Sequence, residues 1–139
     1  MGRTVIFDSE FFHVEHDAEA RVVWVARTPK SSRGDDAFID VGHLFEVLAT
    51  IPAAESALVL DARKAVGRND PDFERRVVPM WNKQFRRFKR AAVLVQTAVG
   101  VLQSKRLTND SAFGMQVFDD EVKLRAWLAS GDRDRPDSK

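Results

Sequence analysis

The 139 residues fit one ordinary domain, and 44% hydrophobic with 31% charged residues is the composition of a soluble globular protein, which excludes fibrous, coiled-coil and low-complexity chains. The 22 basic and 21 acidic residues leave a net charge of +1, so the chain as a whole has no bulk attraction for nucleic acid or an anionic membrane. The absence of cysteine excludes disulfide scaffolds, thiolate nucleophiles and thiolate metal sites.

The chain is also without an apolar run that approaches the roughly 20 residues needed to span a bilayer, and its first residues lead into a strand pattern rather than the apolar core of a signal peptide. We therefore expect a cytoplasmic protein. Residues 1–129 are predicted to form a single domain. Residues 130–139 have almost no apolar side chain to anchor them, which predicts a disordered polar tail.

The N-terminal part of the chain predicts extended structure that folds back as a hairpin. Residues 4–7 are β-branched and aromatic. In the next segment Phe12, Val14 and His16 alternate with His13 and Glu15, which is the period of a strand. The polar residues 17–19 predict the turn. Residues 21–27 are apolar on both faces, which is typical of an interior strand that is covered on each side.

A first helix is predicted next, with Asp35 or Asp36 as its N-cap, because a short carboxylate accepts a hydrogen bond from a backbone N–H group at the start of a helix. Apolar residues then recur at spacings of three and four up to Pro52, namely Phe38, Val41, Leu44, Phe45, Leu48 and Ile51. The continuous apolar run of residues 56–61 predicts a buried parallel strand.

A second helix is predicted from Pro71 to about Phe88, because Asp70 suits the N-cap and proline suits the first helical position. The apolar residues 91–95 predict the next strand. Strands that alternate with helical patterns imply right-handed crossovers, so we predict an α/β fold with a mixed β-sheet and helices packed against it.

The C-terminal part predicts a short third helix over residues 99–107, a last strand over residues 113–118 and a last helix. Asp119 or Asp120 is the predicted N-cap of that last helix. Its apolar residues are Val122, Leu124, Trp127 and Leu128.

Two segments carry a resemblance to a known family. They are residues 58–63 (LVLDAR) leading into residues 67–74 (GRNDPDFE), and residues 117–121 (VFDDE) with residues 126–128 (AWL). With its hairpin, its helix and strand repeats and its final helix, the chain resembles the SpoIIAA-like fold of STAS domains and of the short bacterial STAS/SEC14-type proteins. The resemblance implies a non-enzymatic regulatory domain that binds another protein, as anti-anti-sigma factors do.

The site that is phosphorylated in some members of that family departs from their pattern here. In those members a serine or threonine lies in the loop between the central strand and the following helix. The matching residues 62–70 contain no hydroxyl side chain, so we expect no phosphorylation at this place. Asp70 either imitates a permanently charged state or, as is more usual, caps the helix.

The sequence contains no recognisable catalytic set. It has no Gly-x-Ser-x-Gly motif, no glycine-rich phosphate loop and no His-Glu-x-x-His zinc motif, so we predict neither an enzyme nor a cofactor or metal site. His13 and His16 are three apart on an extended segment and therefore point to opposite faces. His43 lies off the apolar stripe of the first helix. The pairs Asp35-Asp36 and Asp119-Asp120 are better explained as helix caps than as acid and base.

The second helix separates its apolar and basic side chains most clearly. At 100° per residue one arc holds Phe73, Val77, Met80, Trp81, Phe85 and Phe88. The opposite arc, here named the basic face, consists of Arg75, Arg76, Lys83, Arg86 and Arg87. Pro79 shares this side, and Lys89 and Arg90 are predicted to extend it. The basic face is a solvated helix surface, a docking surface for an acidic protein, or a site for nucleic acid or anionic lipid.

The functional prediction is a STAS-like protein–protein interaction module that docks an acidic partner through this helix, with nucleic acid disfavoured by the balanced net charge and self-association left open. The predicted partner-binding residues are Arg68, Asn69, Asp70, Arg75, Arg76, Lys83, Arg86 and Arg87. The alternative is a SEC14-like carrier of a small apolar ligand or lipid, lined by some of the 10 Phe and 3 Trp residues. In the main interpretation those aromatic residues fill a closed core.

Overall fold

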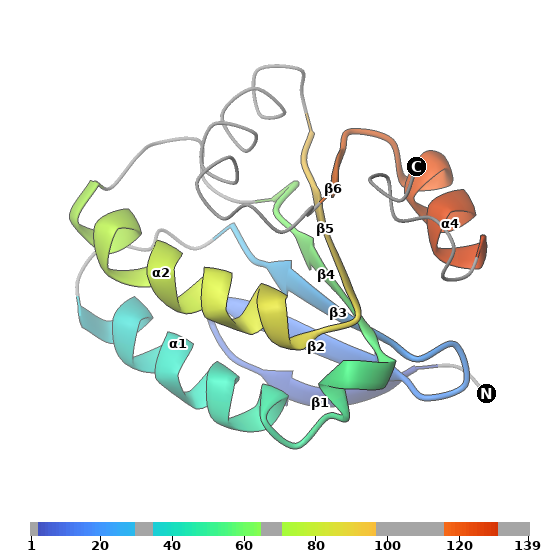
Figure 1. The fold of residues 1–139 in the computed structure, drawn as a ribbon. Coiled ribbons are helices and arrows are strands. Elements are labelled where there is room, and N and C mark those ends of the chain that lie inside the picture. The colour runs from blue at the N-terminus through green and yellow to red at the C-terminus, as the bar shows by residue number, and fades with distance from the viewer. Residues whose placement is uncertain (1–2, 30–34, 65–70, 97–115, 131–139) are drawn as a thin grey trace.

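The structure, a computed structural model, describes residues 3–29, 35–64, 71–96 and 116–130, with the side chains of 35, 71–75, 77 and 78 left out. Within these ranges six strands form one mixed sheet, and helices pack on both of its faces, so the predicted α/β class is confirmed (Figure 1). The strands are β1 (Thr4–Asp8), β2 (Phe12–Asp17), β3 (Val22–Arg27), β4 (Ala57–Asp61), β5 (Arg90–Leu94) and β6 (Gln116–Phe118). The helices are α1 (Asp35–Leu48), the short 3₁₀ helix η1 (Ala53–Glu55), α2 (Pro71–Arg87) and α4 (Glu121–Ala129).

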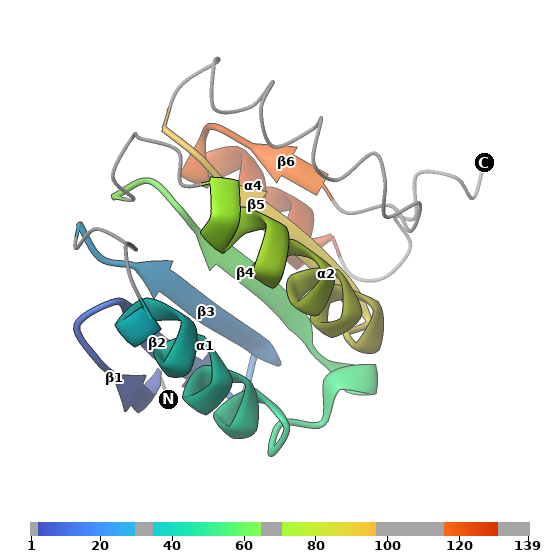
Figure 2. The same cartoon turned by 90° about the vertical axis from the view of Figure 1, so that its left-hand side faces the viewer.

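The strands lie in the sheet in their order along the chain, from β1 to β6. β1, β2 and β3 pair antiparallel, whereas β3, β4, β5 and β6 pair parallel. A parallel pair needs a crossover connection, and α1 and α2 supply the crossovers from β3 to β4 and from β4 to β5. Figures 1 and 2 show α1 and α2 side by side on one face of the sheet and α4 on the other face.

The hairpin between β2 and β3 turns where the polar residues predicted it. The Asp17 carboxylate accepts a hydrogen bond from the Ala20 N–H at 3.0 Å, which closes the turn. Arg21 has φ 60°, in the left-handed region, and so cannot continue the extended strand. β3 therefore begins at Val22, one residue later than the sequence predicted.

Apolar side chains fill the space on both faces of the sheet. The larger core lies between the sheet and the pair α1 and α2, and its completely buried members include Val14, Val23, Val25, Val41, Leu44, Leu48 and Leu58. A smaller core lies under α4, where Leu124 packs on Val59, Ala92 and Leu94. The central strands thus bury both faces, as continuous apolar runs predicted.

The ends of α1 differ from the prediction. The helix begins at Asp35, so Asp35 and Asp36 lie in its first turn, where a carboxylate is still favourable, rather than at the N-cap. It ends at Leu48 rather than at Ile51. After Leu48 the hydrogen bonds follow the 3₁₀ pattern, because the N–H groups of Thr50 and Ile51 donate to carbonyls three residues back, at 3.0 and 3.1 Å.

The other predicted helix ends are confirmed where the structure describes them. α2 begins at Pro71, and Asp120 is the N-cap of α4, its carboxylate accepting from the N–H groups of Val122 and Lys123. The strand predicted before α4 is described from Gln116 onward. The predicted cap at Asp70, the short helix over residues 99–107 and the tail beyond Ser130 lie outside the described residues. Among the helices that are described, none is long and apolar enough to cross a membrane.

Candidate functional site

α2 turns one side to the core and the opposite side to solvent. Trp81, Phe85 and Phe88 are buried against the sheet and α1, as predicted. Lys83 and Arg87 are exposed on the other side, and so is Pro79. A proline there removes a backbone N–H on the solvent side, where water replaces the lost helix bond at small cost.

The predicted binding residues fall into three groups. The exposed residues of α2 are Arg76, Lys83, Arg86 and Arg87, which the structure brings together on one helix surface. Arg75 lies in α2, but its side chain is outside the described part of the chain. The loop residues Arg68, Asn69 and Asp70 also lie outside the described residues.

The exposed basic residues differ in how firmly the protein holds them. The guanidinium carbon of Arg76 lies 3.9 Å from the centre of the Phe38 ring, a cation–π contact that joins α2 to α1. Arg87 donates a hydrogen bond to the Gln84 side chain at 2.7 Å, within its own helix. Arg76 is therefore part of the packing between the two helices as well as part of the basic face.

Arg90 does not extend the basic face, contrary to the prediction. It lies at the start of β5, where the strand has turned its side chain to the α4 side of the sheet. There it donates to the backbone carbonyls of Trp127 and Leu128, at 3.0 Å each, and its guanidinium lies 4.5 Å from the centre of the Trp127 ring. A cation at these carbonyls is favourable because they form the negative end of the helix dipole. Arg90 therefore anchors α4.

Aromatic rings fill the region under α2. The Trp81 ring centre lies 5.0 Å from that of Phe45, 5.5 Å from that of Phe85 and 6.5 Å from that of Phe12. These distances are typical of packed aromatic pairs. The space between α2, α1 and the sheet at Trp81 is therefore occupied by the chain's own side chains.

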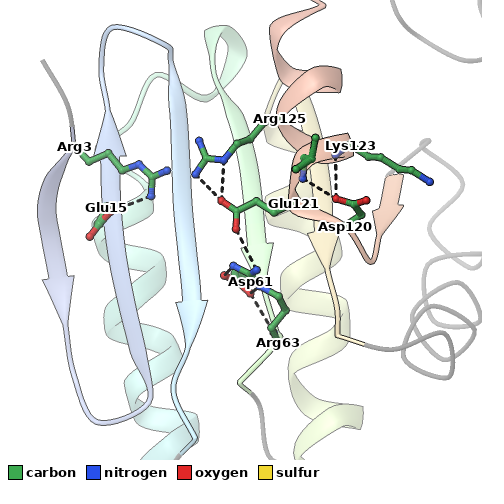
Figure 3. A network of polar contacts seen from close by, with 9 residues as sticks. Arg3, Glu15, Asp61, Arg63, Asp120, Glu121, Lys123 and Arg125 are labelled. Atoms are coloured by element: carbon green, nitrogen blue, oxygen red, sulfur yellow. Dashed lines mark hydrogen bonds and ion pairs between the residues drawn. The ribbon is translucent and has the colours of Figure 1, made fainter.

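A second polar feature, which the sequence did not predict, lies on the α4 side of the sheet (Figure 3). Arg63, just beyond the end of β4, donates to both carboxylate oxygens of Asp61, at 3.0 and 2.8 Å. Its remaining Nη1 group is 3.1 Å from the carboxylate of Glu121, the first residue of α4. Glu121 also accepts from Arg125 one turn later, at 2.7 Å from Nε. These four residues are named the α4 ion-pair network.

The network lowers the pKa of both its carboxyl groups. Burial works to raise the pKa of Asp61, but the hydrogen bonds from Arg63 outweigh it and hold that pKa below its ordinary value. The hydrogen bonds from Arg125, with a smaller contribution from Arg63, hold the pKa of Glu121 below its ordinary value. Both carboxylates are therefore stabilised in the charged form, which suits a structural ion pair rather than a general acid near neutral pH.

A smaller group of charges lies beside this network, on β1 and β2. Glu15 accepts from Arg3 at 3.1 Å and contacts His13 at 2.9 Å, and His13 also contacts Asp8 at 3.2 Å. The hydrogen bond to Glu15, and next that to Asp8, raises the pKa of His13. The guanidinium groups of Arg3 and Arg125 both lie near the Trp24 ring, at 4.3 and 5.0 Å from its centre.

These polar groups satisfy one another. His13 and His16 lie on opposite faces of β2, as predicted, since they are three residues apart in a strand whose pairing with β3 has no break in register. Over the ranges that the structure describes, no group of three or more His, Asp or Glu side chains is arranged to hold a metal ion.

One part of the α4 ion-pair network could have been predicted from the sequence. Glu121 and Arg125 are four residues apart, a spacing that brings opposite charges together on a helix. The link to Arg63 depends on the tertiary fold.

We compared the chain with protein-family models, curated proteins and solved structures, and none of them matches it.

Proposed function

We propose that the protein is a non-enzymatic protein-binding module of the STAS-like type, and that it docks an acidic surface of a partner on the basic face of α2. The observation that carries the proposal is the exposure of Arg76, Lys83, Arg86 and Arg87 along one helix. The acidic residues of α2, Asp72 and Glu74, are both in its first turn, and residues 75–109 contain no aspartate or glutamate, so the length of the helix that holds Lys83, Arg86 and Arg87 has no acidic residue. A chain of balanced charge concentrates positive charge here.

The chemistry of this surface favours carboxylates on another protein. Arginine presents a planar set of donors that binds a carboxylate through two parallel hydrogen bonds. Single-stranded nucleic acid is usually bound with exposed aromatic rings between the basic residues, whereas Trp81 and Phe85 of this helix, and Phe88 directly after it, are buried. The net charge of +1 gives the chain no bulk attraction for an anionic membrane. The proposal therefore selects an acidic protein over nucleic acid or anionic lipid.

The proposal assigns no catalytic role to the described residues. The charged groups outside α2 that come closest to a catalytic cluster form the α4 ion-pair network, and its hydrogen bonds hold both carboxyl groups in the charged form. Screens for hydrolase, phosphatase and nucleotide turnover on the purified chain should therefore be blank. Turnover that a single substitution abolishes would overturn the non-enzymatic part of the proposal.

We also place the module in the cytoplasm, with which a chain without cysteine is compatible.

The alternative of a SEC14-like lipid carrier has weaker support. It needs space for a guest between the helices and the sheet. The rings of Phe12, Phe45 and Phe85 surround Trp81 at packing distances and occupy that region themselves.

Two variants of equal charge change test the docking surface. In the first, Lys83→Glu and Arg87→Glu reverse the basic face. In the second, the matched control, Lys64→Glu and Lys123→Glu reverse two exposed lysines elsewhere. Arg76 is left unchanged because it stacks on Phe38. All three chains should melt within a few degrees of one another, since exposed substitutions usually change stability by less than about 0.5 kcal/mol each.

The immobilised wild-type chain and the control variant should capture the same acidic proteins from a lysate of the source cells, with the bound proteins identified by mass spectrometry. The variant of the basic face should lose them. Equal capture by all three chains would show that this surface binds no partner and would return it to a solvated helix face.

A further inference from the structure

The outer surface of α1 is acidic, in contrast to that of α2. α1 contains two aspartates in its first turn, Asp40 and Glu46, and no lysine or arginine. Asp40 is partly buried and accepts a hydrogen bond from the Ser9 hydroxyl at 2.5 Å. Its side chain therefore points to the loop between β1 and β2 and does not belong to the outer surface of α1. Asp36 and Glu46 are exposed. Between them the outer surface carries Ile39, which remains 55% exposed.

α1 and α2 lie side by side and run in the same direction, because each follows a parallel strand and returns to the start of the next (Figure 2). The stacking of Arg76 on Phe38 fixes their relative height. Seven residues further along α2, or about 10 Å at 1.5 Å per residue, Lys83 lies near the level of Glu46. Near the opposite end, Arg76 lies near the level of Asp36. Acidic and basic groups are thus matched in height on two neighbouring helices.

This arrangement is self-complementary. We propose that two copies of the chain associate through the α1 and α2 layer, with the α1 surface of each copy on the basic face of the other. A two-fold axis that runs along the helices, between α1 and α2, exchanges the two helices and leaves the height of every residue unchanged. The proposal rests on the proposed function, because it takes the basic face as a docking surface and identifies the acidic partner as a second copy.

The contacts that follow are specific. Lys83 of one copy meets Glu46 of the other, and Arg76 meets Asp36, each pair occurring twice by symmetry. Ile39 and Pro79 lie between these pairs and supply an apolar centre, which explains why a large apolar side chain on α1 is left exposed. An interface of two helices with charged ends is small and polar, so the association is weak and weakens further with salt.

Sedimentation velocity of the full chain over a concentration series, in low and in high salt, tests this dimer. The wild-type chain should associate in low salt and dissociate in high salt. Lys83→Glu and, separately, Glu46→Lys should each weaken the association about tenfold or more, because each places like charges opposite one another at two symmetric positions. The chain that carries both substitutions should recover it, since the charges are only exchanged. Lys64→Glu with Lys123→Glu is the control and should associate as the wild type does.

A wild-type chain that remains monomeric throughout would overturn the dimer, and so would equal association of all variants. Such a result leaves the docking proposal standing if acidic proteins from the lysate are still lost with Lys83→Glu and Arg87→Glu. Conversely, association that depends on Lys83 but not on Glu46 would overturn the role of α1, because Lys83 would then contact another acidic surface of the second copy. A change of the thermal melt in Glu46→Lys is checked by circular dichroism, so that loss of folding is not mistaken for loss of contact.

Discussion

Arg63 and Glu121 form an ion pair at 3.1 Å that joins the end of β4 to the first turn of α4. Arg63 binds Asp61 at the same time, so one guanidinium holds two carboxylates from different parts of the chain. At the other end of α4, Arg90 donates to the last carbonyls of the helix. α4 is therefore fastened to the sheet at both ends by arginine, with Leu124 buried between them.

Replacing Asp61 by asparagine should lower the free energy of unfolding by about 1–2 kcal/mol, because the Arg63 donors lose a charged acceptor whose side chain is only 20% exposed. Arg125→Gln is the comparison. It breaks an exposed pair within one helix and removes the exposed contact of Arg125 with the Trp24 ring, so it should cost less, about 0.5–1 kcal/mol. Urea denaturation measures both values. A loss with Arg125→Gln as large as that with Asp61→Asn would contradict the account of the network.

The same network predicts how stability depends on acid. The pKa values of Asp61 and Glu121 lie below their ordinary values of 3.8 and 4.5, so the folded state binds these protons less readily than the unfolded state. Their contribution is therefore present above those ordinary values and is lost as the pH falls through the folded-state pKa values. The chain with Asp61→Asn and Glu121→Gln should lose less stability between about pH 5 and pH 3 than the wild type. Parallel stability curves in that range would refute this.

Arg90→Lys should loosen the C-terminal end of α4 without unfolding the domain. Lysine keeps the charge but cannot donate to the carbonyls of Trp127 and Leu128 in the same two-pronged geometry, and it stacks less well on the Trp127 ring. Hydrogen exchange of the α4 amides should become faster, whereas exchange in α1 should stay as in the wild type. Unchanged exchange in α4 would mean that the packing of Leu124 holds the helix alone.

A closed aromatic core predicts that the purified chain carries no apolar guest. Organic extraction followed by mass spectrometry should recover no stoichiometric small molecule, and added lipid should leave the melting temperature unchanged. A ligand present at about 100 times its dissociation constant would instead contribute about 2.7 kcal/mol of stability. A recovered lipid would move the carrier interpretation ahead of the binding module.

The features that the sequence predicted are those set by neighbouring residues. The hairpin, the apolar sides of α1 and α2, Pro71 at the start of α2 and the Asp120 cap all follow from spacing or from one residue's own chemistry. The small errors at Arg21 and at the end of α1 are also local, since they arise from a left-handed backbone angle and a tightened last turn.

Contacts between distant residues could not be predicted in this way. Arg90 seemed to extend the basic face because it follows α2 in sequence, but the strand carries it to the opposite face, where its partner is 37 residues away. The pair of Arg63 with Glu121 and the stacking of Arg76 on Phe38 likewise need the tertiary fold. For the candidate site, helical periodicity placed five basic residues in one arc of α2, and the four whose side chains the structure describes are exposed there. Periodicity could not show that Arg76 also packs on α1.

The central claim is that the basic face of α2 binds carboxylates of another protein, and an NMR titration tests it most directly. Isotope-labelled chain is titrated with a peptide of ten glutamates, beside the Lys83→Glu and Arg87→Glu variant. The amide shifts should change over residues 76–88 in the wild type and should change little in the variant. Shifts that cluster instead on the α4 side of the sheet, or that are the same in both chains, would contradict the claim.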